Sequence, residues 1–356
     1  MNALASTNRI DGRVSAGWFL GLSALLLLIM SLSALGLGAM PVGWRELLAL
    51  AGRPFGLDAD VSEQTKAVLF YIRLPRVVLA VLAGAGLAVG GAALQALFRN
   101  PLADPGVLGI SSGAALGAGA MIVLGSNWET ASNGALAGFA VPLAAFAGAL
   151  AAAGTVWRLS IGGEHDAAST LLAGIAVNAL AGAGIGLLSW LADDAALRNF
   201  TFWTLGSLAS AGWEMLVPVI LLVIPALLRL QRQAQALNLL LLGETEAGHL
   251  GVDTRRLKAE VIGLATLTVG ALVAVTGVIG FLGLAAPHLA RLCIGPDHRR
   301  LLPGAALAGA LLLQGADLCA RTWAAPAELP IGLLTALLGG PFFLWLLRRH
   351  AGGREC

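Results

Sequence analysis

Charged residues are scarce in this chain: only 12% of its 356 residues are Asp, Glu, Lys or Arg, against about 25% in a typical soluble domain. Apolar residues make up 58% of the sequence, and the mean hydropathy is +0.83. This balance excludes an ordinary soluble globular fold. Since roughly twenty apolar residues in a helix cross the bilayer core, it predicts an all-α polytopic membrane protein.

Residues that perform chemistry are also few. The three cysteines (Cys293, Cys319 and Cys356) have no metal-binding or redox spacing, and their odd number argues against a disulfide scaffold. Lys66 and Lys258 are the two lysines, and neither follows a phosphate-binding glycine loop. An intramembrane enzyme would need a catalytic motif such as paired aspartates or H-E-x-x-H inside the membrane, and the apolar segments of the sequence contain neither. We therefore expect a chain without catalytic residues, cofactor or metal.

Uncharged runs of membrane-spanning length recur along the chain. They lie at residues 14–44, 77–98, 107–128, 130–157, 167–192, 215–228, 261–290, 301–316 and 331–347. A β-barrel would instead show alternating segments of about ten residues. The run at 261–290 is too long for one ordinary span, and its glycines and Pro287 predict a sharp turn into a short returning helix.

The distribution of basic residues favours ten spans over nine. With ten spans and both termini in the cytoplasm, fifteen Lys and Arg residues lie inside and seven outside. With nine spans the numbers become ten inside and twelve outside, which opposes the positive-inside rule. The sequence therefore predicts ten membrane helices in one transmembrane domain covering residues 1–356.

The order of the spans predicts an inverted repeat. Spans two to five and spans seven to ten each contain four helices, but the two sets begin on opposite sides of the membrane. Each set has a polar hinge with proline followed by small residues, at 100–109 and at 295–309. Inverted repeats are common among transporters. Glycines four residues apart, such as Gly109 and Gly113, predict either close helix packing or faces that line an opening path.

Ionisable side chains are almost absent from the predicted spans, which argues against a secondary transporter that couples transport to an ion. Asp317 is the chief exception. Arg321 follows it by four residues on the same helix face, so the default expectation is an intrahelical ion pair. If transport uses ATP, the motor is another polypeptide.

Seven motifs in order identify a family. They are IRLPR (72–76), ALFRNPLADPG (96–106), LLAGIAVNAL (171–180), FWTLGSL (202–208), GFLGLAAPHLAR (280–291), DHRRLLPG (297–304) and AELPIGLLTALLGGPFF (327–343). Together they resemble the permease subunits of type II ABC importers, which move ferric siderophores, haem or cobalamin across the bacterial inner membrane. The resemblance implies a homodimer, two ATPase subunits that bind ATP and Mg, and a periplasmic substrate-binding protein.

The longest predicted cytoplasmic connection, 237–258, resembles the segment that seats such permeases on their ATPase. The family pattern L-G-E-x-x-A-x-x-L-G is matched by Gly243, Glu244, Ala247, Leu250 and Gly251. Acidic residues at the start and a glycine at the end predict a short helix over 244–250. The alternative is a solvated amphipathic loop.

The resemblance also suggests docking and path residues. Arg73, Arg76 and Arg321 match arginines that meet glutamates of the binding protein, unless Asp317 occupies Arg321 and the other two anchor the second span at the headgroups.

Residues 197–213 resemble the outer mouth of haem permeases, where Arg198, beside Phe202 and Trp203, would meet haem propionates. The alternative is that Arg198 only anchors a helix end at the membrane interface. Asn178 is a further path candidate. The expected cargo is haem, with a ferric siderophore or cobalamin as alternatives.

Overall fold

The computed structural model describes residues 14–38, 40, 42–52, 61–125, 137–160, 167–325 and 327–351. Within these ranges every regular element is helical. They are α1 (Ala16–Gly36), α2 (Trp44–Gly52), α3 (Glu63–Ala67), a π-helical stretch (Val68–Arg73), α4 (Leu74–Leu97), a 3-10 turn (Pro105–Leu108), α5 (Ile110–Leu124), α7 (Ala137–Ser160), α8 (Ala167–Leu191), α9 (Asp194–Thr204), α10 (Trp213–Arg232), α11 (Ala234–Leu240), α12 (Glu244–His249), α13 (Thr254–Thr276), α14 (Leu282–Ile294), α15 (His298–Trp323) and α16 (Ile331–Ala351). The two chain ends, predicted to be cytoplasmic, lie outside the described residues.

Ten of these helices correspond to the ten predicted spans. Seven are long and apolar enough to cross a membrane, namely α1, α3–α4, α7, α8, α10, α13 and α15, and three shorter apolar helices, α5, α14 and α16, complete the set. The ambiguous run at 261–290 does contain a turn. α13 ends at Thr276, and α14 begins at Leu282 after Phe281, whose φ of 65° lies in the left-handed region.

The packing follows the predicted inverted repeat of two sets of four helices. In the repeat α4 corresponds to α13, α5 to α14 and α7 to α15. The contact of α4 with α15 is matched by that of α13 with α7, and the contact of α5 with α7 by that of α14 with α15. The pairing of the two hinges is corrected, however. The polar hinge at 98–109 follows α4, the first helix of the first set. Its counterpart is therefore the turn at 277–281, which follows α13, the first helix of the second set. The hinge at 295–297 follows α14, the second helix of that set.

The hinge before α5 is held by its own side chains. The Asp104 carboxylate accepts a hydrogen bond from the Gly106 backbone N–H at 2.8 Å and so caps the 3-10 turn. Burial raises the pKa of the Asp104 carboxyl above its usual range, and that hydrogen bond partly offsets the effect.

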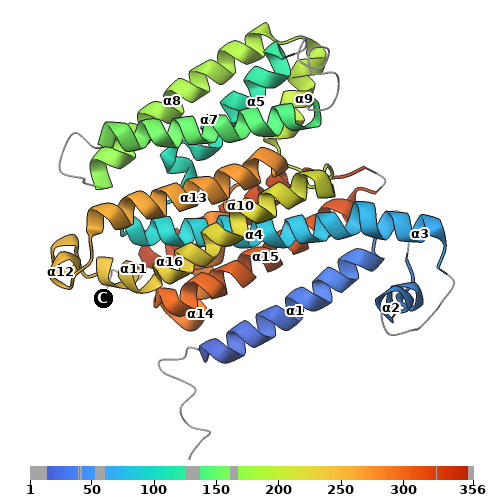
Figure 1. The fold of residues 1–356 in the computed structure, drawn as a ribbon, viewed down its shortest axis with the longest axis horizontal. Coiled ribbons are helices and arrows are strands. Elements are labelled where there is room, and N and C mark those ends of the chain that lie inside the picture. The colour runs from blue at the N-terminus through green and yellow to red at the C-terminus, as the bar shows by residue number, and fades with distance from the viewer. Residues whose placement is uncertain are drawn as a thin grey trace, which may run out of the picture.

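Figure 1 shows α4 running through the middle of the lower part of the molecule, among α10, α13, α14 and α15, with α5, α7, α8 and α9 forming a layer above. Nearly all of α4 from Pro75 to Leu97 is buried. At the two ends of the long axis lie α12 and α3, on opposite sides of the bundle.

The crossing of α4 and α15 requires glycine on both helices. A Cβ on Gly84 would meet the carbonyl oxygen of Gly309 and come within 2.7 Å of the Ala310 Cα. A Cβ on Gly309 would meet the Gly84 carbonyl in return. Because backbone atoms cannot move aside as a flexible side chain can, this pair sets the distance between the two helices. The predicted close packing is confirmed at Gly113, where a Cβ would meet the carbonyl oxygen of Gly148 on α7.

We predict that Gly84→Ala lowers the thermal unfolding midpoint of the purified protein in detergent. Overpacking a tight interior contact costs about 1–3 kcal/mol. The matched control is Gly182→Ala on α8, where no atom lies within 4 Å of the added Cβ. That control is expected to keep or slightly raise the midpoint, since alanine favours helices over glycine. Equal midpoints for the two variants would contradict the role of Gly84.

Candidate functional site

The predicted coupling segment folds as α11, a tight turn and α12. Gly243 has a φ of 132° and starts α12, and Gly251, with a φ of 86°, follows its end. Asp253 then caps α13 by accepting a hydrogen bond from the Arg256 backbone N–H at 3.0 Å. A short helix closed by glycine is therefore confirmed, because the positive φ angles on both sides prevent α12 from continuing into its neighbours.

The five coupling residues differ in their exposure. Ala247 is fully buried, and Gly243 is buried as well. Leu250 is 59% exposed, and Gly251 is exposed. A small residue is therefore needed at Ala247 for α12 to pack against its own chain, since a larger side chain there would push the helix away. An apolar side chain that remains exposed, as at Leu250, is the one available to a partner.

Glu244 joins α12 to the next membrane helix through an ion pair. Its Oε2 lies 2.5 Å from Nζ of Lys258, in the second turn of α13. Lys258 is 8% exposed and borders a small hollow with Phe98 and Trp157. The sequence reading missed Lys258 as a partner. The only available signal was a lone lysine at the foot of a predicted span, which is costly to bury without a counter-charge.

At the opposite end of the bundle, Arg76 and Asp317 form the centre of a buried charge cluster. Arg76 Nε lies 2.9 Å from Asp317 Oδ1, and its two terminal nitrogens donate to the Glu328 carboxylate at 2.8 and 2.9 Å. Arg321 Nε lies 3.1 Å from Asp317 Oδ2, so the expected intrahelical pair is confirmed. Asp317 is fully buried, and Arg76 is 6% exposed. The cluster joins α4, α15 and the connection to α16.

Arg73 and Arg321 also close the end of α1. Arg73 donates hydrogen bonds to the carbonyl oxygens of Leu35 at 2.5 Å, Gly36 at 3.0 Å and Met40. Arg321 donates to the Ala34 carbonyl at 3.3 Å. The last carbonyls of a helix have no partners inside it and carry partial negative charge. The two guanidinium groups supply those partners.

The structure therefore places Arg73, Arg76 and Arg321 together, but inside the chain. Arg73 is 5% exposed, and the Arg321 side chain 7%. Docking of a binding protein through these charges stays a prediction. Such docking would cost free energy, because a glutamate of the binding protein would have to displace Glu328 or the carbonyl groups at the end of α1 from these arginines.

The path candidates Arg198, Phe202 and Trp203 lie on α9, which packs against α5. Arg198 is exposed, and in the described part of the chain no acidic side chain forms an ion pair with it. Phe202 is 60% exposed, while Trp203 is half-buried. The Asp193 carboxylate caps the helix at the Ala196 backbone N–H. These three side chains are thus held on one short helix.

Asn178 serves a different purpose from the other path candidates. Its Oδ1 accepts a hydrogen bond from the Ser112 hydroxyl at 2.5 Å, and its Nδ2 donates to the Gly106 carbonyl at 3.0 Å. Both ends of the amide are used to hold α8 against the hinge before α5. The structure therefore assigns Asn178 a role in packing, whereas a role in the path stays a prediction.

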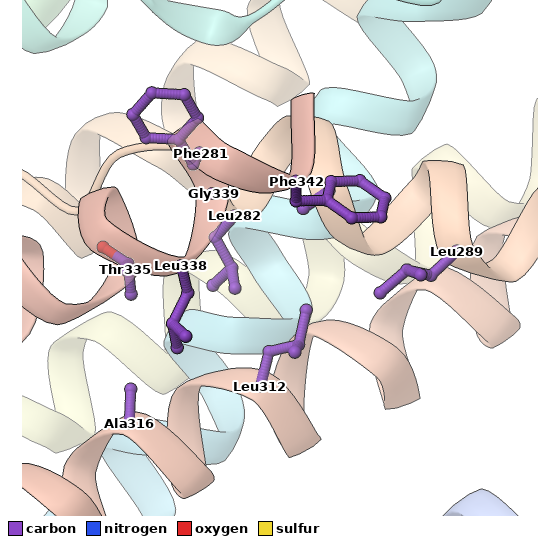
Figure 2. Close-up of a pocket in the computed structure, with 10 residues that line it drawn as sticks. Phe281, Leu282, Leu289, Leu312, Ala316, Thr335, Leu338, Gly339 and Phe342 are labelled. Atoms are coloured by element: carbon purple, nitrogen blue, oxygen red, sulfur yellow. The ribbon is translucent and has the colours of Figure 1, made fainter. Parts of the chain in front are cut away.

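Further hollows lie between the described membrane helices, and two of them border the candidate path residues or the last three spans. One, of about 570 Å³, is bordered by Trp203, Asn199 and Ser210 between α5, α7, α9, α10 and α13. The other, of about 200 Å³, is almost wholly apolar, and Figure 2 shows Leu282, Leu312 and Leu338 pointing into it from α14, α15 and α16. The first has polar groups at its border and adjoins α9. Among the described residues, no cluster of His, Cys, Asp and Glu has the composition of a metal site.

We predict that Asp317→Ala strongly destabilises the protein. Removing the carboxylate leaves Arg76 and Arg321 buried without their shared partner, and breaking a buried ion pair costs about 3–5 kcal/mol. The unfolding midpoint of the purified variant should fall by many degrees. Glu63→Gln is the control, since the Glu63 side chain is 88% exposed and its ion pair with Lys66 contributes little to stability. An unchanged midpoint for Asp317→Ala would show that the cluster is not needed for stability.

Comparisons with known proteins agree with this architecture. A family model described as the FecCD transport family matches residues 25–349. The hemin transport system permease protein HmuU of Yersinia pestis is 47% identical over 97% of this chain and 100% of its own length. The vitamin B12 import system permease protein BtuC of Klebsiella pneumoniae subsp. pneumoniae is 39% identical over 99% of each chain.

A solved structure of a metal-chelate type ABC transporter in an inward-facing conformation has the same fold. Its TM-score is 0.82 at 31% identity, and the match covers 94% of this chain and 99% of that one. The agreement therefore extends over the whole membrane bundle. This chain belongs to the FecCD transport family and is a multi-pass inner-membrane permease of the ABC importer type.

Proposed function

We propose that this chain is the permease subunit of an importer that moves haem from a periplasmic binding protein into the cytoplasm. The observation that carries this proposal is the 47% identity to a hemin permease over nearly the entire chain, compared with 39% to the vitamin B12 permease of Klebsiella. The exposed Arg198 and Phe202 on α9 fit such a cargo. A cation suits a propionate, and an aromatic side chain suits a porphyrin face.

ATP hydrolysis belongs to a separate subunit in this proposal. Neither lysine is available as a phosphate-binding residue, since Lys258 pairs with Glu244 and Lys66 with Glu63. The functional complex contains two copies of this chain, two ATPase subunits and one periplasmic binding protein. The α12 end faces the cytoplasm together with both termini, and the α9 and α3 end faces the periplasm.

Cobalamin and a ferric siderophore are the alternative cargoes. The cobalamin alternative is supported by the B12 permeases at 39–40% identity. The siderophore alternative is supported by the solved metal-chelate transporter. Each cargo has its own chemistry at the mouth, because cobalamin presents amides whereas haem presents two carboxylates.

The deciding experiment is transport in proteoliposomes that contain the permease, its ATPase and its binding protein. We expect uptake of haem that requires ATP hydrolysis, with cobalamin and ferric siderophores transported poorly. A catalytically dead ATPase subunit is the control for ATP dependence. Faster uptake of cobalamin or of a ferric siderophore than of haem would refute the proposed cargo and leave the family assignment intact.

The role of Arg198 leads to a prediction about rates. Arg198→Ala should slow haem uptake at limiting haem by roughly fivefold at most, because an exposed ion pair contributes little. Arg45→Ala on α2 removes another exposed arginine and should leave uptake unchanged. Both variants should bind the binding protein as the unmodified permease does. Equal uptake by the two variants would show that Arg198 takes no part in the path and favour a role as an anchor of the helix end.

The exposure pattern of α12 leads to a prediction about the ATPase contact. Leu250→Asp should abolish co-purification of the ATPase, because it places a charge in the centre of an apolar contact. Leu48→Asp on α2 is the matched control, since Leu48 is 69% exposed at the far end of the bundle. Both variants should keep the unfolding midpoint. Retention of the ATPase by Leu250→Asp would show that α12 is not the seat.

A further inference from the structure

A long groove runs between α10 and α13 on the outside of the membrane bundle. It encloses about 570 Å³ and is lined by leucines of both helices, including Leu221, Leu228 and Leu264. Leu221 is 69% exposed and Leu228 60%. Such exposed leucines in a membrane-spanning helix face hydrocarbon, so the groove is open to lipid rather than to water.

The groove has a charged end. Arg229 and Arg232, in the last turn of α10, border it where the helix leaves the membrane. Arg229 forms an ion pair with Glu260, while Arg232 is exposed and has no ion-pair partner among the described residues. Arg256 is also exposed, and its charge acts on Glu260. Arg229 and Arg256 thus share the Glu260 carboxylate, while the Arg232 charge is not compensated by an ion pair among the described residues, which leaves net positive charge at this end.

The length of the groove matches one leaflet of the membrane. From Leu221 to Arg232 the helix advances eleven residues, or about 16 Å at 1.5 Å each. Half of a hydrocarbon core of about 30 Å is about 15 Å. A lipid whose acyl chain extends along the leucines thus places its headgroup at the arginines. Pro225 lines the groove midway and has no backbone N–H to donate within α10.

We infer that this groove is a binding site for an anionic phospholipid. One acyl chain lies along the leucines of α10 and α13, and the phosphate accepts hydrogen bonds from Arg232, with Arg229 as a second donor. Basic pockets between membrane helices are suited to anionic headgroups, and each basic side chain near the surface strengthens binding about fivefold. A zwitterionic lipid gains no such factor. The groove is lined by residues of α10 and α13 and by none of α12 or α9, and nothing in the proposed transport function assigns it.

The test is a lipid titration of the purified permease in detergent, read by native mass spectrometry. Phosphatidylglycerol and phosphatidylcholine with identical acyl chains are compared. We expect phosphatidylglycerol to bind at least fivefold more tightly. Arg232→Gln should remove about fivefold of that affinity and leave phosphatidylcholine binding unchanged. The matched control is Arg300→Gln, which removes an exposed arginine at the same end but outside the groove.

A second pair of variants tests the acyl part of the site. Leu221→Gln should weaken both lipids, whereas Leu172→Gln on α8, at an equal 69% exposure, should weaken neither. Excess inorganic phosphate should not displace phosphatidylglycerol. Equal binding of the two lipids, equal effects of Arg232→Gln and Arg300→Gln, or displacement by phosphate would each overturn the assignment. Loss of bound lipid only when two copies associate would indicate that the groove is a subunit contact instead.

Discussion

Close backbone contact along α4 is the constraint on which the rest of this structure depends. Lipid tails are as apolar as leucine, so membrane helices associate through packing and hydrogen bonds rather than through the hydrophobic effect. Gly84 meets Gly309 on α15, and Gly91 meets the backbone of Gly283 on α14. These glycines set the distances of α15 and α14 from α4, which also packs against α10 and α13.

Charge is used sparingly, and at the two ends of the bundle. At one end Arg76, Asp317 and Arg321 join α4 to α15, while arginines close the end of α1. At the other end Glu244 and Lys258 join α12 to α13. Buried ion pairs add little net stability, but removing one partner is costly. Each cluster therefore fixes one joint between helices.

The outer surface carries its own information. The hollow between α14, α15 and α16 is apolar, whereas the groove between α10 and α13 combines leucines with arginines at the membrane boundary. Of these two, the groove between α10 and α13 is the one whose residues complement both the acyl chain and the phosphate of a phospholipid. A permease whose helices move within a bilayer is thereby held at a defined depth by a bound headgroup, in addition to the aromatic and basic residues at its edges.

The sequence by itself determined the class, the ten spans, the repeat and the short helix α12, because hydropathy, basic residues and glycine positions are local signals. It could not show that Arg76 meets Glu328, since 252 residues separate them. Nor could it show that Ala247 is buried while Leu250 is exposed, or that Asn178 supports the hinge. Motif matches mark residues that matter but do not say whether they face a partner or their own chain. That distinction depends on which helices lie side by side, and only the tertiary structure decided it.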